Sequence, residues 1–305
     1  MQDLAITSPP RFHGGMTLPA FDTSLFKIAA KPLDLTDWLD PDAAMPVQLA
    51  EKTRLREKRF SEIFAELPES HPAQAELLAL LADYLPARFP HLWQKRPEGL
   101  LVVPTGEVVP LASNPLLQAA KLVQDDLLIL TRAEAGWRLT AASLSFPSSW
   151  VLSEKIGKVL DAIHAPVPDF GPGTRSATIM ARMFDAMRPE TPLIRWNWSL
   201  YGDTRLFHPD VSGPDMPRFG SGERADPVHL RIERQTLRKL PETGAVVFTI
   251  RISLVDLKTL AGLSGAKALA SQLHAQLLAL TPEQLDYKGL TRERDRVLLR
   301  LADII

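Results

Sequence analysis

The fold is decided by residues 228–254, VHLRIERQTLRKLPETGAVVFTIRISL. Apolar and polar residues alternate over 228–236, which is the period of a β-strand. Over 246–254 every second residue is again apolar, and residues 241–244, PETG, carry the proline and glycine that are typical of a turn. The stretch therefore predicts a hairpin of two antiparallel strands.

A third strand-like segment lies upstream at residues 193–200, with tryptophans on one side and Arg195 and Asn197 on the other. Further strand pairs are indicated at 100–103 with 107–111 and 127–130 with 137–141, and helices at 47–67, 73–88, 153–165, 175–187, 265–279 and 291–303. The order is strands, helices and then three antiparallel strands. It predicts an α+β fold with one antiparallel sheet, helices gathered on one face, and helical extensions at both ends.

The chain shows no repeat and no low-complexity linker, so a single main domain is expected. Residues 1–45 are rich in proline and aspartate and predict an irregular lead that lies over the body. Residues 46–262 form the predicted main domain, and residues 263–305 form helices packed on that same domain.

Composition excludes several classes of protein. The net charge is −1, with 45% apolar and 23% charged residues, which argues against a general nucleic-acid binder. No run of about 18 apolar residues indicates a membrane span, and the N-terminus lacks the features of a secretory signal, so a cytoplasmic protein is expected. The chain has no cysteine, which excludes disulfides, a thiolate-ligated haem and an ordinary iron–sulfur cluster on this chain. Electrons for any redox chemistry must then come from another chain or an organic cofactor.

Residues 150–168, WVLSEKIGKVLDAIHAPVP, predict a short helix that presents one histidine at its end. Ser153 suits the N-cap, and Pro166 prevents the helix from continuing, so His164 lies at the C-terminal end beside an apolar stripe. An imidazole there can bind a metal or cofactor through one nitrogen and donate the other N–H to a carbonyl. The alternative is a core or capping histidine with its hydrogen bonds satisfied.

The polar side of the strand at 228–236 carries His229, Arg231, Glu233 and Gln235. One interpretation is a solvated face, which antiparallel sheets commonly have. The other is the wall of a pocket, in which Glu233 holds an ammonium group and Arg231 or Arg234 pairs with a carboxylate. Arg234 falls on the opposite side of the strand.

Several longer motifs resemble those of the haem-dependent oxidative N-demethylase alpha-subunit-like proteins. The resemblance covers roughly residues 45–260 and rests on the following stretches: YLPARFP at 84–90, FPSSW at 146–150, EKIGK at 154–158, IHAPVP at 163–168, RWNW at 195–198, LRIERQTLRKLP at 230–241 and VFTIR at 247–251.

This resemblance implies a PAS-like fold that binds haem b and oxidises a small secondary amine such as dimethylamine with O2. In the family, electrons come from NADPH through separate FMN and 2Fe–2S components, and tetrahydrofolate is used elsewhere in the complex. The absence of cysteine agrees with that division of labour.

Under the resemblance, His164 becomes the candidate axial haem ligand, and His229 on the polar strand face is its rival. Arg231 and Arg195 become candidates for holding the haem propionates. Glu233 becomes the candidate for anchoring the amine cation, since a buried charge needs a partner. Two other functions stay open: a haem-containing PAS sensor or O2 carrier without turnover, and a haem-free binding protein that keeps the fold.

Overall fold

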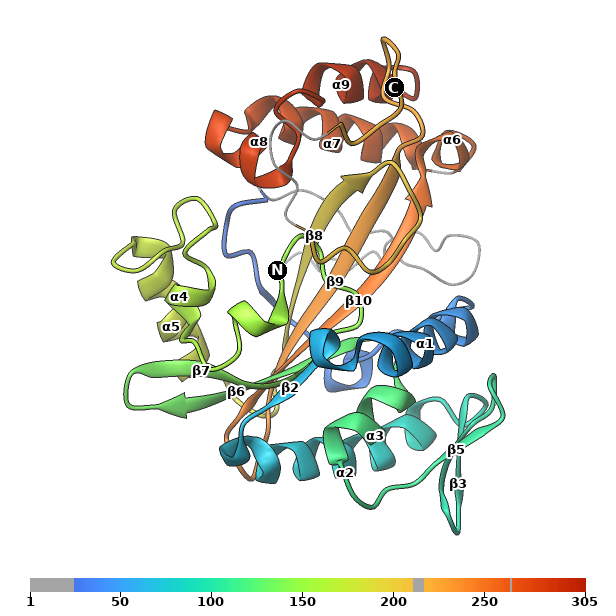
Figure 1. Cartoon of the computed structure of the whole chain (residues 1–305), viewed down its shortest axis with the longest axis vertical. Helices are drawn as coiled ribbons and strands as arrows, with labels where there is room; N and C mark the ends of the chain where they lie inside the picture. Colours follow the sequence, from blue (N-terminus) through green and yellow to red (C-terminus); the bar gives the residue numbers. More distant parts are fainter. Residues whose placement is uncertain (1–24, 211–216, 264) are drawn as a thin grey trace, which may run out of the picture.

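A long twisted antiparallel sheet runs through the middle of the molecule (Figure 1). The computed structural model describes residues 25–210, 217–263 and 265–305. Within these ranges the sheet has seven strands in the order β1-β8-β9-β10-β6-β7-β2. Their bounds are β1 Lys31–Pro32, β2 Phe64–Glu66, β6 Asp126–Ala133, β7 Gly136–Ser143, β8 Leu193–Tyr201, β9 His229–Lys239 and β10 Val246–Asp256. A separate small sheet contains β3 (Trp93–Arg96), β4 (Gly99–Val102) and β5 (Glu107–Val109).

The hairpin predicted from residues 228–254 is confirmed. Strands β9 and β10 pair along their whole length, from His229 opposite Asp256 to Lys239 opposite Val246. The turn closes where the Leu240 N–H donates to the Ala245 carbonyl at 2.8 Å. The strand at 193–200 is β8, which pairs with β9 as predicted, and the two upstream strand pairs also form.

The helices lie around this sheet. They are α1 Met45–Ile63, α2 His71–Arg88, α3 Pro115–Leu122, α4 Leu160–Ile163, α5 Arg175–Ala186, α6 Leu257–Leu260, α7 Ala266–Ala279, α8 Pro282–Lys288 and α9 Arg294–Ala302. Short 3-10 turns occur at Leu35–Asp37, Pro68–Ser70 and Leu152–Glu154. The first helix ends at Ile63, earlier than predicted, because residues 64–66 pair with β7 as an edge strand. Helices α3, α6 and α8 were not predicted.

The expectation that all helices cover one face of the sheet is wrong. Helices α1 to α3 and α7 to α9 cover one face at its two ends, while α4 and α5 cover the other (Figure 1). Alternation along the strands explains this, because consecutive apolar residues of β6 point to opposite sides: Leu127 joins the core under α2 and α3, and Leu128 joins the core under α4 and α5. A sheet that is apolar on both faces needs a cover on each.

The predicted continuous helix from Ser153 to Ala165 is also wrong. Ser153 lies inside a 3-10 turn, Gly157 has a left-handed φ of 80°, and α4 begins only at Leu160. The intervening main chain pairs with β7 instead. The Gly157 N–H donates to the Leu139 carbonyl at 2.8 Å, and the Leu139 N–H donates to the Lys158 carbonyl at 3.0 Å. These bonds use the groups that a helix would need.

Across the described ranges, no helix combines the length and apolarity needed to cross a bilayer.

Candidate functional site

The polar residues of β8 and β9 face each other across the two strands. In register, Asn197 lies opposite Glu233 and Ser199 opposite Arg231. The interpretation as a solvated face is wrong for the centre of this surface, because Arg231 is 0% exposed, Glu233 5% and Gln235 6%. Polar groups buried to this degree must find partners within the protein or in a ligand.

Glu233 is held mainly through one of its two carboxylate oxygens. Oε2 accepts hydrogen bonds from Asn197 Nδ2 at 3.0 Å and from Gln235 Nε2 at 2.8 Å. Oε1 lies 3.9 Å from Arg231 Nε. Two amide donors therefore contact one oxygen, and the other oxygen has a single weak ion-pair contact.

Arg231 binds the main chain of two covering segments. Its Nη2 donates to the Phe146 carbonyl at 2.6 Å, and its Nη1 donates to the Leu206 carbonyl at 2.9 Å. The Asp126 carboxylate accepts the N–H groups of Ser145 and Phe146, each at 2.8 Å. Burial raises the pKa of Asp126 to about 6. The FPSSW motif at 146–150 is thus attached to the sheet by two buried side chains of opposite charge.

Beyond this attachment, the motif contributes two hydroxyls to the end of β8. The Tyr201 hydroxyl lies 3.0 Å from Ser148 Oγ and 3.2 Å from Ser149 Oγ. The His208 ring stacks on the Tyr201 ring with 4.0 Å between centroids, and its Nε2 lies 3.3 Å from Asp203 Oδ1. Burial outweighs that carboxylate and lowers the pKa of His208 to about 4. His208 is therefore neutral near pH 7.

His164 caps the C-terminal end of α4. Its Nδ1 lies 2.7 Å from the Leu160 carbonyl, so Nδ1 carries the proton in the neutral ring and Nε2 keeps its lone pair. Burial lowers the pKa of His164, and the positive charges of Lys155 and Arg195 lower it further. A neutral imidazole with its N–H bound to a carbonyl is the arrangement that metal-ligating histidines adopt.

Arg195 links His164 to the polar strand face. Its charge acts on His164, while the Glu233 carboxylate partly offsets the burial that lowers the pKa of Arg195. Among the described residues, Arg195 Nε is buried without a hydrogen-bond partner, as is Gln235 Oε1 across the strands. An unpaired buried donor on a cation is costly and indicates a place where a ligand or water binds.

Helix α8 supplies two further groups that sequence reasoning did not single out. Lys288 Nζ donates to the Trp198 carbonyl at 2.8 Å and to Asn197 Oδ1 at 3.2 Å. Burial lowers the pKa of Lys288 to about 8. Burial and the Glu233 carboxylate raise the pKa of Tyr287 to about 12. Both residues lie between the helices predicted at 265–279 and 291–303, so no sequence signal pointed to them.

His229 lies at the other end of the polar face, opposite Tyr201. Gln235, the partner of Arg195, lies six positions further along β9, which corresponds to roughly 20 Å along a strand. The structure therefore brings Arg195, Glu233 and Arg231 onto one surface and places His164 near Arg195, whereas His229 is distant from that end.

The centre of the site carries more positive than negative charge. Arg195, Arg231 and Lys288 lie around the Glu233 carboxylate, and the buried Asp126 carboxylate also acts on Arg231. Buried charges of one sign are costly unless a counter-charge binds. The surface therefore suits an anionic group such as a carboxylate near Arg195.

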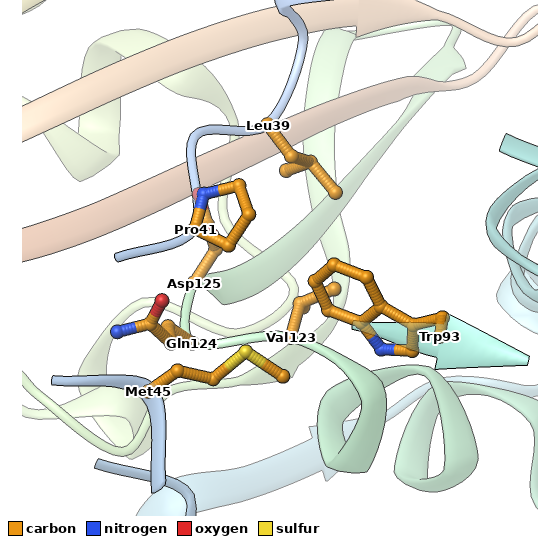
Figure 2. A pocket seen from close by; sticks show the side chains of 7 residues that line it. All are labelled: Leu39, Pro41, Met45, Trp93, Val123, Gln124 and Asp125. Carbon is orange, nitrogen blue, oxygen red and sulfur yellow. The ribbon is translucent and has the colours of Figure 1, made fainter. Parts of the chain in front are cut away.

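A pocket elsewhere in the molecule does not serve this site. It is lined by Leu39, Pro41, Met45, Trp93, Val123, Gln124 and Asp125 (Figure 2). None of the site residues described above lines it.

The donor set at α4 and β8 fits a haem. His164 offers one neutral nitrogen for iron, and Arg195 offers an unpaired buried donor for a propionate. In the described part of the chain, no group of three or more histidine, aspartate or glutamate side chains forms a site for a bare metal ion.

The chain matches the family model HODM_asu-like, described as haem-dependent oxidative N-demethylase, alpha subunit-like, over residues 29–298. It belongs to this family, and the resemblance predicted from the sequence motifs is confirmed. Membership suggests a haem-dependent, N-demethylase-like oxidoreductase. The family description implies haem as the cofactor and, because it names an alpha subunit, other subunits.

Proposed function

We propose that this member of the haem-dependent oxidative N-demethylase alpha subunit-like family demethylates a small secondary amine such as dimethylamine. The reaction uses O2 and electrons from a partner reductase that carries FMN and a 2Fe–2S cluster and takes electrons from NADPH. The proposal includes haem b as the cofactor and a PAS-like relationship for the central sheet. The observation that carries it is the neutral His164, whose Nδ1–H is bound to the Leu160 carbonyl beside the cationic end of the polar face.

His164 is the proposed axial ligand, through Nε2. Arg195 is the proposed partner of a propionate, because its buried Nε has no partner among the described residues. Arg231 shares the unpaired buried Nε, but both of its Nη atoms donate to main-chain carbonyls. We therefore assign Arg231 chiefly to holding the segments around Phe146 and Leu206 over the site. Haem, when bound, supplies the activation of O2 that no side chain of this protein can supply.

Glu233 is the proposed anchor of the amine. Its Oε2 is occupied by two amide donors, so Oε1 is the oxygen available to accept an N–H of the substrate. The surrounding cations oppose the added positive charge of the substrate ammonium. An anionic group bound at Arg195 offsets one of these cations. The covering segments at Phe146 and Leu206 exclude water, which strengthens the carboxylate–ammonium attraction.

The test is reconstitution with hemin followed by titration with dimethylamine. We expect a Soret band, a saturable spectral change with dimethylamine, and formaldehyde release when O2 and a competent reductase are present. No Soret band after reconstitution would support a haem-free binding protein. A haem-loaded protein that releases no formaldehyde from any small secondary amine would support a sensor.

Glu233→Gln tests the anchor. The substitution removes the charge that attracts the ammonium, so we expect the dimethylamine dissociation constant to rise at least tenfold while haem content stays unchanged. Glu242→Gln, in the exposed turn between β9 and β10, is the matched control and should leave that constant unchanged. Equal affinities in the Glu233→Gln variant and the wild type would reject the anchor.

A further inference from the structure

Lys288 is a buried cation that the proposed chemistry does not use. It is 8% exposed, and it is the last residue of α8, where Gly289 ends the helix with a left-handed φ of 63°. A capping box between Thr281 and Gln284 fixes the start of this helix. The Arg218 guanidinium donates to the Lys288 carbonyl at 2.9 Å. The backbone that carries the ammonium is therefore held at both ends of the helix.

The ammonium and the Glu233 carboxylate together orient the Asn197 side chain. Lysine can only donate hydrogen bonds, so the group facing Nζ at 3.2 Å must be the amide oxygen. Asn197 Nδ2 then faces Glu233 Oε2 at 3.0 Å. The reverse orientation would place the NH2 group against the ammonium and the amide oxygen against the carboxylate, and both contacts would be repulsive.

We propose that Lys288 is a positioning residue of this site, which orients Asn197 so that Glu233 Oε2 is occupied and Oε1 is left for the ligand. The expected effect of Lys288 on amine binding rests on the proposed function, whereas its expected effect on Asn197 does not. The C-terminal helices thereby become part of the site, although they contribute no group to the reacting atoms.

The charges around Lys288 agree with this role. Glu233 on β9 favours the charged ammonium, while Arg195 on β8 and Arg218 in the following connection oppose it. Burial is the largest influence and lowers the pKa of Lys288 to about 8, so the ammonium is mostly protonated at pH 7. The Trp198 carbonyl oxygen accepts a hydrogen bond from Lys288 Nζ at 2.8 Å and holds the ammonium at the edge of β8.

The experiment measures Asn197 directly in the full-length apoprotein. The side-chain NH2 signals of Asn197 are followed by 1H–15N NMR in wild type, in Lys288→Met and in the matched control Lys267→Met, which changes an exposed lysine of α7. We expect exchange of these hydrogens with solvent to become at least tenfold faster in Lys288→Met and to stay unchanged in the control. Unchanged exchange in Lys288→Met would overturn the inference.

A second measurement does not depend on the fold of the Lys288 variant. The 13Cε signal of Lys288 is titrated in wild type and in Glu233→Gln. Because Glu233 favours the charged ammonium, its neutralisation should shift the Lys288 titration to lower pH. Coincident Lys288 curves in the two proteins would also overturn the inference.

The haem-loaded protein then separates this inference from the proposed function. If both hold, Lys288→Met raises KM for dimethylamine at least tenfold and changes kcat less than threefold, because the lost interaction binds the ground state and transition state alike. A wild-type protein that binds no amine, together with the expected changes at Asn197, would reject the function and keep the positioning role.

Discussion

His164 and His229 lie in different surroundings. His164 has its Nδ1 bound to the Leu160 carbonyl and a pKa lowered by burial, which leaves a neutral ring with a lone pair on Nε2. His229 lies at the first position of β9, opposite Tyr201. The chemistry of a single side chain is here set by what its second nitrogen contacts.

We therefore expect His164→Ala to abolish tight haem binding or to change the spin state, because the iron loses its protein ligand. His229→Ala should keep the haem content and spectrum of the wild type. Visible spectra of the two reconstituted variants at equal protein concentration check this. The opposite result, with haem lost only in His229→Ala, would move the ligand to β9.

His208 makes stability depend on pH. Its pKa is lowered to about 4 in the folded protein, against an ordinary value of 6.5. Between these values the unfolded chain binds a proton that the folded chain does not, so stability is lost as the pH falls from 6.5 towards 4. The loss is at most on the order of 3 kcal/mol.

Urea unfolding of wild type and His208→Gln at pH 7 and pH 4.5 checks this. The difference in unfolding free energy between the two pH values should be smaller in the variant by about 2 kcal/mol. Asp126, whose raised pKa acts in the opposite direction, contributes equally to both proteins and cancels. His91→Gln, at an exposed position, should behave as wild type; a His208 variant that does the same would contradict the assignment.

At the scale of elements, the central strands bind the segments that cover them through buried charges. Arg231 of β9 and Asp126 of β6 together hold the carbonyl and the N–H of Phe146. The adjacent Ser148 and Ser149 then reach the Tyr201 hydroxyl on β8. These segments without regular structure are in this way attached to the strands beneath them.

Arg231→Lys should release these segments, because one ammonium cannot reach the carbonyls of both Phe146 and Leu206. We expect a loss of stability of about 3 kcal/mol or more, since buried main-chain oxygens lose their donors. Arg205→Lys, which changes an exposed arginine beside Asp203, should cost less than about 0.5 kcal/mol. Chemical denaturation of both variants measures the loss of unfolding free energy. Equal losses would show that the hydrogen bonds of Arg231 contribute no more to stability than those of an exposed arginine.

At the scale of the whole molecule, the C-terminal helices share a core with the sheet. One buried cluster contains Trp198, Leu230 and Ile232 of β8 and β9 together with residues of α6 to α9. Lys288 adds polar contacts from α8 to β8. We infer that residues 263–305 belong to the same cooperative unit as the sheet.

Leu273→Ala tests this cooperativity. Leu273 of α7 is 1% exposed, and its truncation should cost about 2–5 kcal/mol and lower a single unfolding midpoint seen alike by far-UV and near-UV circular dichroism. Leu278→Ala, on the same helix but 56% exposed, should change stability by less than about 0.5 kcal/mol. Two separate transitions in Leu273→Ala would indicate that the C-terminal helices fold independently.

Part of the site could be predicted and part could not, for physical reasons. Alternation over 228–236 placed Glu233 and Arg231 on one face and Arg234 on the other, and β9 has this arrangement, with Arg234 bound to the Trp38 carbonyl on the opposite face. The same alternation does not predict whether that face is exposed to solvent, because its burial is decided by segments around Phe146 and Leu206 that are distant in the sequence. Lys288 was missed for the same reason.

Local sequence alone determined the two upstream strand pairs, the last three antiparallel strands and the family, because period-two alternation, turn residues and motif order are properties of neighbours along the chain. Tertiary contact alone decided that helices cover both faces, that Gly157 pairs with β7 instead of continuing a helix, and that α8 delivers an ammonium to Asn197. These outcomes depend on which distant group satisfies a buried charge or a main-chain hydrogen bond, and a linear pattern carries no information about such partners.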